Sequence, residues 1–180
     1  MIERPRAWAF RCTRMANAST VLLVGNHPVA RDTLARVISR DAGFIVCDEE
    51  SGVDGALGAL ERTAADFVVI DFPAEASDGL ALVEALHALR PRTGVLVVMA
   101  HDDLPLAERV LRAGARGLLT WAEVRDLGPT ALRGLLRGEI YVGQRLSDEL
   151  VNRLLHAPRA GQRRRICGDL RIDRPDPARS

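Results

Sequence analysis

The stretch FVVIDFP at residues 67–73 decides the fold that this sequence predicts. The four consecutive apolar residues from Phe67 to Ile70 are typical of a strand that is buried on both faces of a sheet. Asp71 follows them directly, at the point where the strand ends. Because open α/β sheets bind their ligands beside the carboxyl ends of the strands, Asp71 is the first candidate for a functional side chain.

Four further apolar runs lie before and after this stretch. Together they predict five strands, at residues 21–24, 44–47, 67–71, 95–99 and 117–120. Segments with helical periodicity separate the strands, and one more short helix is expected at residues 147–155. Apolar runs without alternation indicate a parallel sheet with helices on both faces. Right-handed crossovers then favour a flavodoxin-like, doubly wound α/β fold with the strand order 2-1-3-4-5.

Local start signals mark several of these helices. Pro28 suits the first position of a helix, and Ser77 opens the helix that follows the third strand. Asp102 or Asp103 is expected to cap the next helix. The last helix of the sheet domain contains Gly128-Pro129, so we expect it to start late or to be kinked.

The composition limits the class of protein. A chain of 180 residues, 47% of them hydrophobic, suits one α/β domain with a sizeable core. The formal net charge of +1 gives no general reason to expect a nucleic-acid or membrane partner, and no apolar run is long enough to span a bilayer. The three widely spaced cysteines form no metal-ligand pattern, so reduced thiols are expected. These features predict a cytoplasmic protein without membrane contact.

Several short motifs occur in an order that is typical of one known family. They are VGNHP at 24–28, Ile70-Asp71 followed by Asp78-Gly79, AHDD at 100–103, RAGARG at 112–117 and GEIY at 138–141. On these motifs, the chain from about Val21 to Leu155 resembles the receiver domain of bacterial two-component response regulators. The subgroup it resembles carries a C-terminal LuxR-type helix-turn-helix. The resemblance implies a CheY-like fold and a role in phosphorelay signal transduction and transcription regulation.

The resemblance also implies a phosphoacceptor, and this falls on Asp71. In the family, an acidic pair after the first strand holds Mg²⁺ together with the acceptor, but here the pair is Gly25-Asn26. The family's hydroxyl residue at the end of the fourth strand falls on Met99, and its lysine after the fifth strand falls on Trp121. These four positions define a degenerate pocket. The switch aromatic of the family falls on Leu118.

Four such replacements together argue against an efficient kinase-driven switch, because metal ions and cationic side chains stabilise most of the charge in phosphoryl transfer. We therefore expect no enzymatic activity, no catalytic residue and no cofactor, with Mg²⁺ bound only if the pocket is still active. Asp71 and Asn26 are the weak candidates for metal ligands. Glu75 is a spare carboxylate near the pocket, and Asp78 is a helix cap rather than a ligand.

These expectations favour an atypical receiver that acts through protein interaction without phosphorylation. The first alternative is a genuine phosphoacceptor receiver that uses Asp71 in a phosphorelay. The second is a pseudo-receiver that senses a small apolar molecule beside Met99 and Trp121. Asp71 can also be a retained rim residue with a purely structural role.

The expected organisation is an unstructured leader at 1–18, a receiver domain at 19–140, a linker helix at 141–157 and a disordered tail at 158–180. The tail is too short for a helix-turn-helix, so no direct DNA binding is expected from this chain. A natural stand-alone receiver and a truncated or frameshifted regulator both stay open. A protein partner or a second copy is expected on the surface of helix 4, strand 5 and helix 5, through Leu104, Leu106 and the Val110 neighbourhood, and a histidine kinase is a further possible partner.

Overall fold

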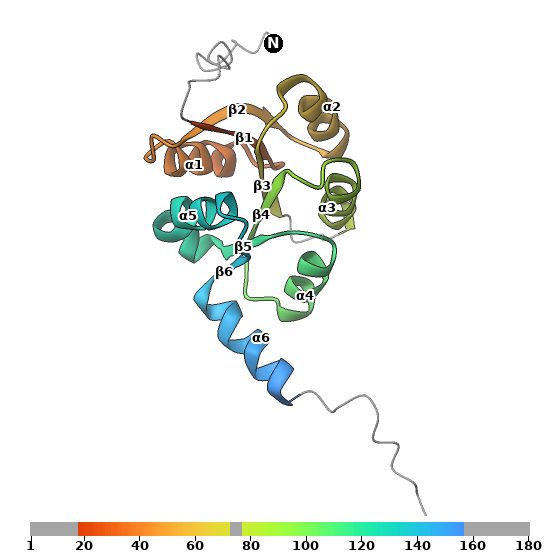
Figure 1. Ribbon diagram of the computed structural model, residues 1–180, viewed down its shortest axis with the longest axis vertical. Coiled ribbons are helices and arrows are strands. Elements are labelled where there is room, and N and C mark those ends of the chain that lie inside the picture. Colours follow the sequence, from red (N-terminus) through yellow and green to blue (C-terminus); the bar gives the residue numbers. More distant parts are fainter. Residues whose placement is uncertain (1–17, 73–76, 157–180) are drawn as a thin grey trace, which may run out of the picture.

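The computed structural model describes residues 18–72 and 77–156 as six strands and six helices that largely alternate along the chain (Figure 1). The strands are β1 (Ser19–Val24), β2 (Phe44–Glu50), β3 (Phe67–Phe72), β4 (Gly94–Met99), β5 (Gly117–Thr120) and β6 (Tyr141–Val142). The helices are α1 (Pro28–Ile38), α2 (Val53–Thr63), α3 (Ser77–Leu89), α4 (Leu104–Arg112), α5 (Trp121–Leu136) and α6 (Gln144–His156).

The strands form one parallel sheet in the order β2-β1-β3-β4-β5-β6. Helices α1 and α5 cover one face, and α2, α3 and α4 cover the other (Figure 1). This arrangement confirms the doubly wound fold and the predicted order of the first five strands. The expected count of five strands was too low, because β6 adds a short sixth strand at the β5 edge.

Each face of the sheet carries its own apolar core, because successive side chains of a strand point to opposite faces. Leu22, Ile70 and Val97 belong to the core under α2, α3 and α4. Val69 and Val98 belong to the core under α1 and α5. The predicted apolar runs are therefore buried from both sides, and β4 is buried along its whole length.

Side-chain caps fix where two helices begin. The Asp103 side chain accepts a hydrogen bond from the Leu106 backbone N–H at 3.0 Å, so Asp103 is the cap of α4. At α5, Thr120 and Glu123 form a capping box, with Thr120 Oγ1 2.9 Å from Glu123 Oε2. The expectation that α5 starts late is wrong, because this box starts the helix at Trp121, and Pro129 lies inside it.

The segment after α5 extends the sheet and then packs beneath α4. The Tyr141 backbone N–H donates to Arg116 O and the Gly143 N–H donates to Leu118 O, both at 2.8 Å. Helix α6 begins at Gln144, three residues earlier than expected, and its Leu146 is fully buried in the core that includes α4 residues. The segment after α5 is thus part of the domain's packing.

The predicted leader and tail lie almost entirely outside the described residues, as do Cys12 and Cys167. The Cys47 side chain is buried. Within the described ranges, no helix combines the length and apolar character that a membrane span requires.

An ion pair joins the loop after α1 to α5. Arg133 Nε lies 2.7 Å from Asp41 Oδ2, and the Asp41 side chain is only 10% exposed. The guanidinium of Arg133, together with the backbone N–H of Gly43, holds the pKa of the Asp41 carboxyl below its usual value.

This ion pair predicts a pH-dependent contribution to stability. A depressed carboxyl pKa stabilises the fold above the unfolded value of about 4, and the contribution disappears as the pH falls through the lower folded value. We expect Arg133→Gln to lower the free energy of unfolding at pH 7 by about 0.5–1 kcal/mol, since Arg133 is largely exposed. Urea denaturation of the unsubstituted protein and of Arg133→Gln should show that the difference in their free energies of unfolding shrinks at a pH below about 4. A difference that does not depend on pH would contradict a stabilising ion pair between Asp41 and Arg133.

Backbone strain at the end of α2 gives a second prediction. Ala64 has φ 46° and is the only non-glycine residue with positive φ in the described chain. A residue with an L side chain is strained by roughly 1–2 kcal/mol in this left-handed conformation. Glycine removes that strain, but its greater freedom in the unfolded chain cancels part of the gain. Ala64→Gly should therefore raise the free energy of unfolding by about 0.5–1 kcal/mol in urea denaturation. The matched control Ala42→Gly, at an exposed loop position without positive φ, should lower it.

Candidate functional site

Asp71 lies at the carboxyl end of β3, between β1 and β4 in the middle of the sheet. It is only 6% exposed, and with Thr120 it is one of two buried polar residues in the described chain. Its Oδ1 accepts a hydrogen bond of 2.9 Å from the indole Nε1–H of Trp121. The capping box begins α5 at Trp121 and so places this indole at the end of β5, within reach of Asp71.

The second carboxylate oxygen of Asp71 faces the loop after β1. His27 Nδ1 lies 3.8 Å from Asp71 Oδ2, and the His27 side chain is 74% exposed. Gly25 is buried against the same carboxylate. A Cβ atom at position 25 would lie 2.6 Å from Asp71 Cβ and 3.2 Å from Asp71 Oδ2. The loop therefore packs directly onto Asp71, in a position that only a residue without a side chain permits.

The possible metal ligands around Asp71 are a poor match for the Mg²⁺ that the family resemblance implies. Magnesium takes oxygen ligands in near-octahedral geometry, but Gly25 supplies no side chain and Asn26 is exposed. Oδ1 of Asp71 already accepts the indole hydrogen bond. Among the described residues, no three His, Cys, Asp or Glu side chains are grouped as a metal site would require. Pro73 and Glu75 lie outside the described residues.

The other two predicted pocket residues, Met99 and Trp121, pack against different cores. Met99 is 2% exposed and belongs to the core under α2, α3 and α4, which also contains Leu118. Trp121 packs against the core under α1 and α5. The two side chains therefore contact different cores, which gives no support to a ligand site lined by both.

An ion pair and a hydrogen bond of Arg31 at the site were not predicted from the sequence. The guanidinium of Arg31 donates to the carbonyl oxygen of Gly25, and its Nε lies 3.4 Å from Glu49 Oε2. Arg31 therefore ties the loop after β1 to β2. Arg31 lies near the start of α1 and Glu49 lies in β2, and no sequence pattern indicates that the two side chains meet.

The junction between β5 and α5 is also joined to α6. Glu123 Oε2 accepts from Thr120, and Glu123 Oε1 accepts from the backbone N–H of Arg145 at 3.4 Å. Arg145 Nη1 also lies 3.4 Å from Asp102 Oδ2 in the exposed loop that contains His101. The spacing of Thr120 and Glu123 is a capping-box signal in the sequence, but the contact with Arg145 depends on the position of α6.

The predicted partner surface is partly taken up by the domain itself. Leu104 is 5% exposed, so it is not the exposed partner contact that was expected, and Val110 itself is fully buried. Leu106 is half-buried. The edge of β5 is paired with β6. The exposed surface on this side therefore includes β6 and α6 as well as α4 and α5.

The chain belongs to the response regulator receiver domain family, whose sequence profile matches residues 21–125. It functions in two-component signalling, as this family does.

Curated relatives and solved structures agree with this assignment. The chain is similar to the transcriptional activator protein ExaE of Pseudomonas putida, with 29% identity over 72% of this chain and 61% of the relative. It is 24% identical to the response regulator UvrY of Escherichia coli K12, over 72% of this chain and 60% of UvrY. The crystal structure of a LuxR-family two-component response regulator from Aurantimonas sp. SI85-9A1 superposes with a TM-score of 0.72 at 22% identity, over 77% of this chain and 99% of that one. The chain thus spans about three fifths of the two curated relatives.

The indole–carboxylate hydrogen bond predicts a measurable coupling. Trp121→Phe keeps an aromatic ring but removes the donor to a buried carboxylate, which should lower the free energy of unfolding by about 1–3 kcal/mol. In the background of Asp71→Ala, where no carboxylate needs a donor, the same change should cost much less. A double-mutant cycle by urea denaturation would measure the difference, and additive effects would show that the hydrogen bond contributes nothing to stability.

Proposed function

We propose that this receiver is non-enzymatic and acts through protein interaction, without phosphorylation of Asp71. The hydrogen bond from Trp121 to Asp71 is the observation that carries the proposal. In the family, a lysine at this position pairs with the phosphoryl group; here an uncharged donor binds the unmodified carboxylate. The indole thus stabilises one arrangement of the β5–α5 junction with no phosphate present.

The charge balance around Asp71 supports the same proposal. A phosphoryl group on Asp71 adds negative charge that needs a metal ion or a cationic side chain to stabilise it. Gly25 and the exposed Asn26 form a weak metal site, and no lysine replaces the missing one, since the chain contains only arginine among its 25 basic residues. We therefore expect no phosphoryl group on Asp71.

The state of the junction can reach the linker helix through direct contacts. Trp121 and Glu123 share the first turn of α5, and Glu123 binds the backbone at the start of α6. The Cβ of any side chain at Gly143 would lie 2.2 Å from Glu123 Oε2, so the chain before α6 passes close to Glu123. We infer that the junction and α6 change position together, so that a partner bound to α6 would bias the state of the junction.

The partner in this proposal is a protein or a second copy of the chain, bound within the cytoplasm. The surface is the exposed part of α4 and α5 extended by β6 and α6, with half-buried Leu106 and 52% exposed Val151 as its apolar contacts. Regulation of transcription, the activity for which the relative ExaE is named, would then proceed through this partner.

Phosphorylation is tested by intact mass spectrometry of the full chain after incubation with acetyl phosphate and Mg²⁺. We expect the mass to stay that of the unmodified chain, because the pocket lacks the metal ligands and the lysine. A single phosphate adduct that disappears in Asp71→Ala would overturn the proposal and favour the genuine phosphoacceptor.

A repaired variant provides the positive control for this experiment. It combines Gly25→Asp, Asn26→Asp, Met99→Thr and Trp121→Lys, which return the family's residues to the pocket. We expect this variant to acquire one phosphate, and to lose it when Asp71→Ala is added. Circular dichroism of each protein would establish that the unmodified samples are folded.

A further inference from the structure

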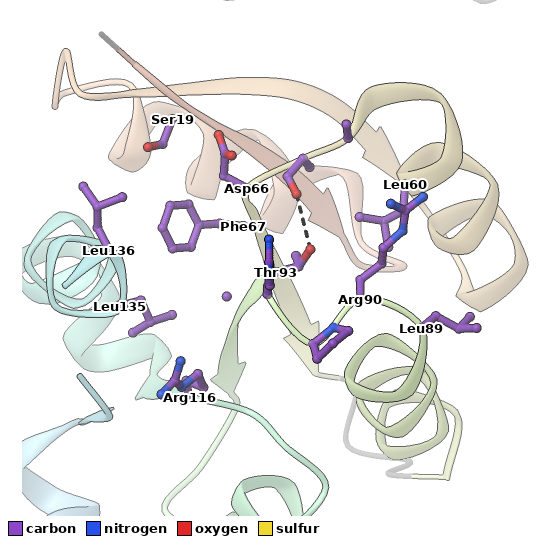
Figure 2. Close-up of a pocket in the computed structure, with 15 residues that line it drawn as sticks. Ser19, Leu60, Asp66, Phe67, Leu89, Arg90, Thr93, Arg116, Leu135 and Leu136 are labelled. Carbon is purple, nitrogen blue, oxygen red and sulfur yellow. Dashed lines mark hydrogen bonds between the residues drawn. The ribbon is translucent and has the colours of Figure 1, made fainter. Parts of the chain in front are cut away.

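A cleft of about 570 Å³ lies at the amino ends of the strands, on the edge of the sheet opposite to Asp71 (Figure 2). The ends of α2, α3 and α5 surround it, together with the first residues of β1, β3 and β4. Its apolar wall consists of Leu60, Phe67, Leu89, Leu135 and Leu136. Leu89 and Leu136 are 65% and 59% exposed, whereas Leu60, Phe67 and Leu135 are buried, so the two exposed leucines are the part of the wall that contacts water.

The same cleft carries an excess of positive charge. Arg90, Arg92 and Arg116 line it, the first two from the loop between α3 and β4. No carboxylate lies within ion-pair distance of these three guanidinium groups among the residues that the structure describes. Arg116 donates only to the carbonyl oxygen of Gly138, at 3.2 Å.

The acidic side chain in the lining, Asp66, forms hydrogen bonds with Thr20 and no ion pair with these arginines. Asp66 is the one carboxylate among the lining residues, and its Oδ2 accepts hydrogen bonds from the backbone N–H and hydroxyl of Thr20 at 2.9 and 3.0 Å. Asp66 therefore serves to hold β1 beside β3. The three exposed guanidinium groups are left as donors without an acceptor of opposite charge.

We propose that this cleft binds a small organic anion with an apolar tail. A carboxylate or phosphate head matches the guanidinium groups, which bind such oxyanions through paired, charge-assisted hydrogen bonds. The tail would cover the exposed side chains of Leu89 and Leu136, and the cleft volume lies within the usual range for small-ligand sites. The site is separate from Asp71 and does not depend on whether that residue is phosphorylated.

The experiment is a titration of the ¹⁵N-labelled full chain with octanoate, followed by the backbone amide signals. Octanoate should cause saturable shifts at Thr93, Gly94 and Arg116, which line the cleft, and none at Gly25 or Asp71 on the opposite edge. Acetate and octanol test the head and the tail alone. Each should bind at least ten times more weakly than octanoate, since each makes only half of the contacts.

Matched variants separate this site from non-specific binding. The double variant Arg90→Gln and Arg92→Gln should weaken octanoate binding by about tenfold or more, a loss of about 1.4 kcal/mol or more, and Leu89→Glu should do the same. Arg125→Gln and Val29→Glu are the controls, since both residues are exposed and neither lines the cleft.

The outcomes decide the proposal in both directions. Saturable shifts in the cleft that the arginine variant weakens, and the controls do not, would support it. No saturable shift, equal binding of octanol, or equal weakening by the control variants would overturn it. All substituted side chains are exposed, so each variant should keep the fold, which the amide spectrum itself reports.

Discussion

A carboxylate buried at the end of a central strand needs a hydrogen-bond donor, and in this protein the indole N–H of Trp121 provides one. Among the residues that the structure describes, the other polar side chain near this carboxylate is His27, which is 74% exposed and offsets little of the cost of burying Asp71. The position of the first turn of α5 is therefore fixed by two groups at once. Thr120 and Glu123 set where the helix begins, and the indole attaches that beginning to β3.

The attachment affects elements far from Asp71 in the sequence. Glu123 accepts from Thr120 with one oxygen and from Arg145 with the other, so the start of α5 and the start of α6 share one side chain. Leu146 then anchors α6 in the core that α4 covers. The contact between Glu123 and Arg145 is exposed and 3.4 Å long, so the buried side chain of Leu146 is the firmer attachment of α6 to the domain.

The fold could be predicted from the sequence because the strands are continuous apolar runs and the motifs occur in the family's order. Strand β6 could not be predicted, since a two-residue strand has no periodicity and forms only where β5 offers a free edge. Pro129 suggested a late start for α5, but a capping box outweighs one missing backbone donor within the helix. The resemblance singled out Gly25 and Trp121, yet their contacts with Asp71 depend on distances that only the packed chain defines.

The contacts of Gly25 and Trp121 with Asp71 occur together at one carboxylate. A side chain at position 25 would force the loop after β1 away from Asp71, because its Cβ would lie only 2.6 Å from Asp71 Cβ. With glycine there, the loop closes onto one side of the carboxylate, while the indole occupies the other. Gly25 and Trp121 therefore contact the same carboxylate, each at a different oxygen, and replacing one of them leaves the contact of the other in place.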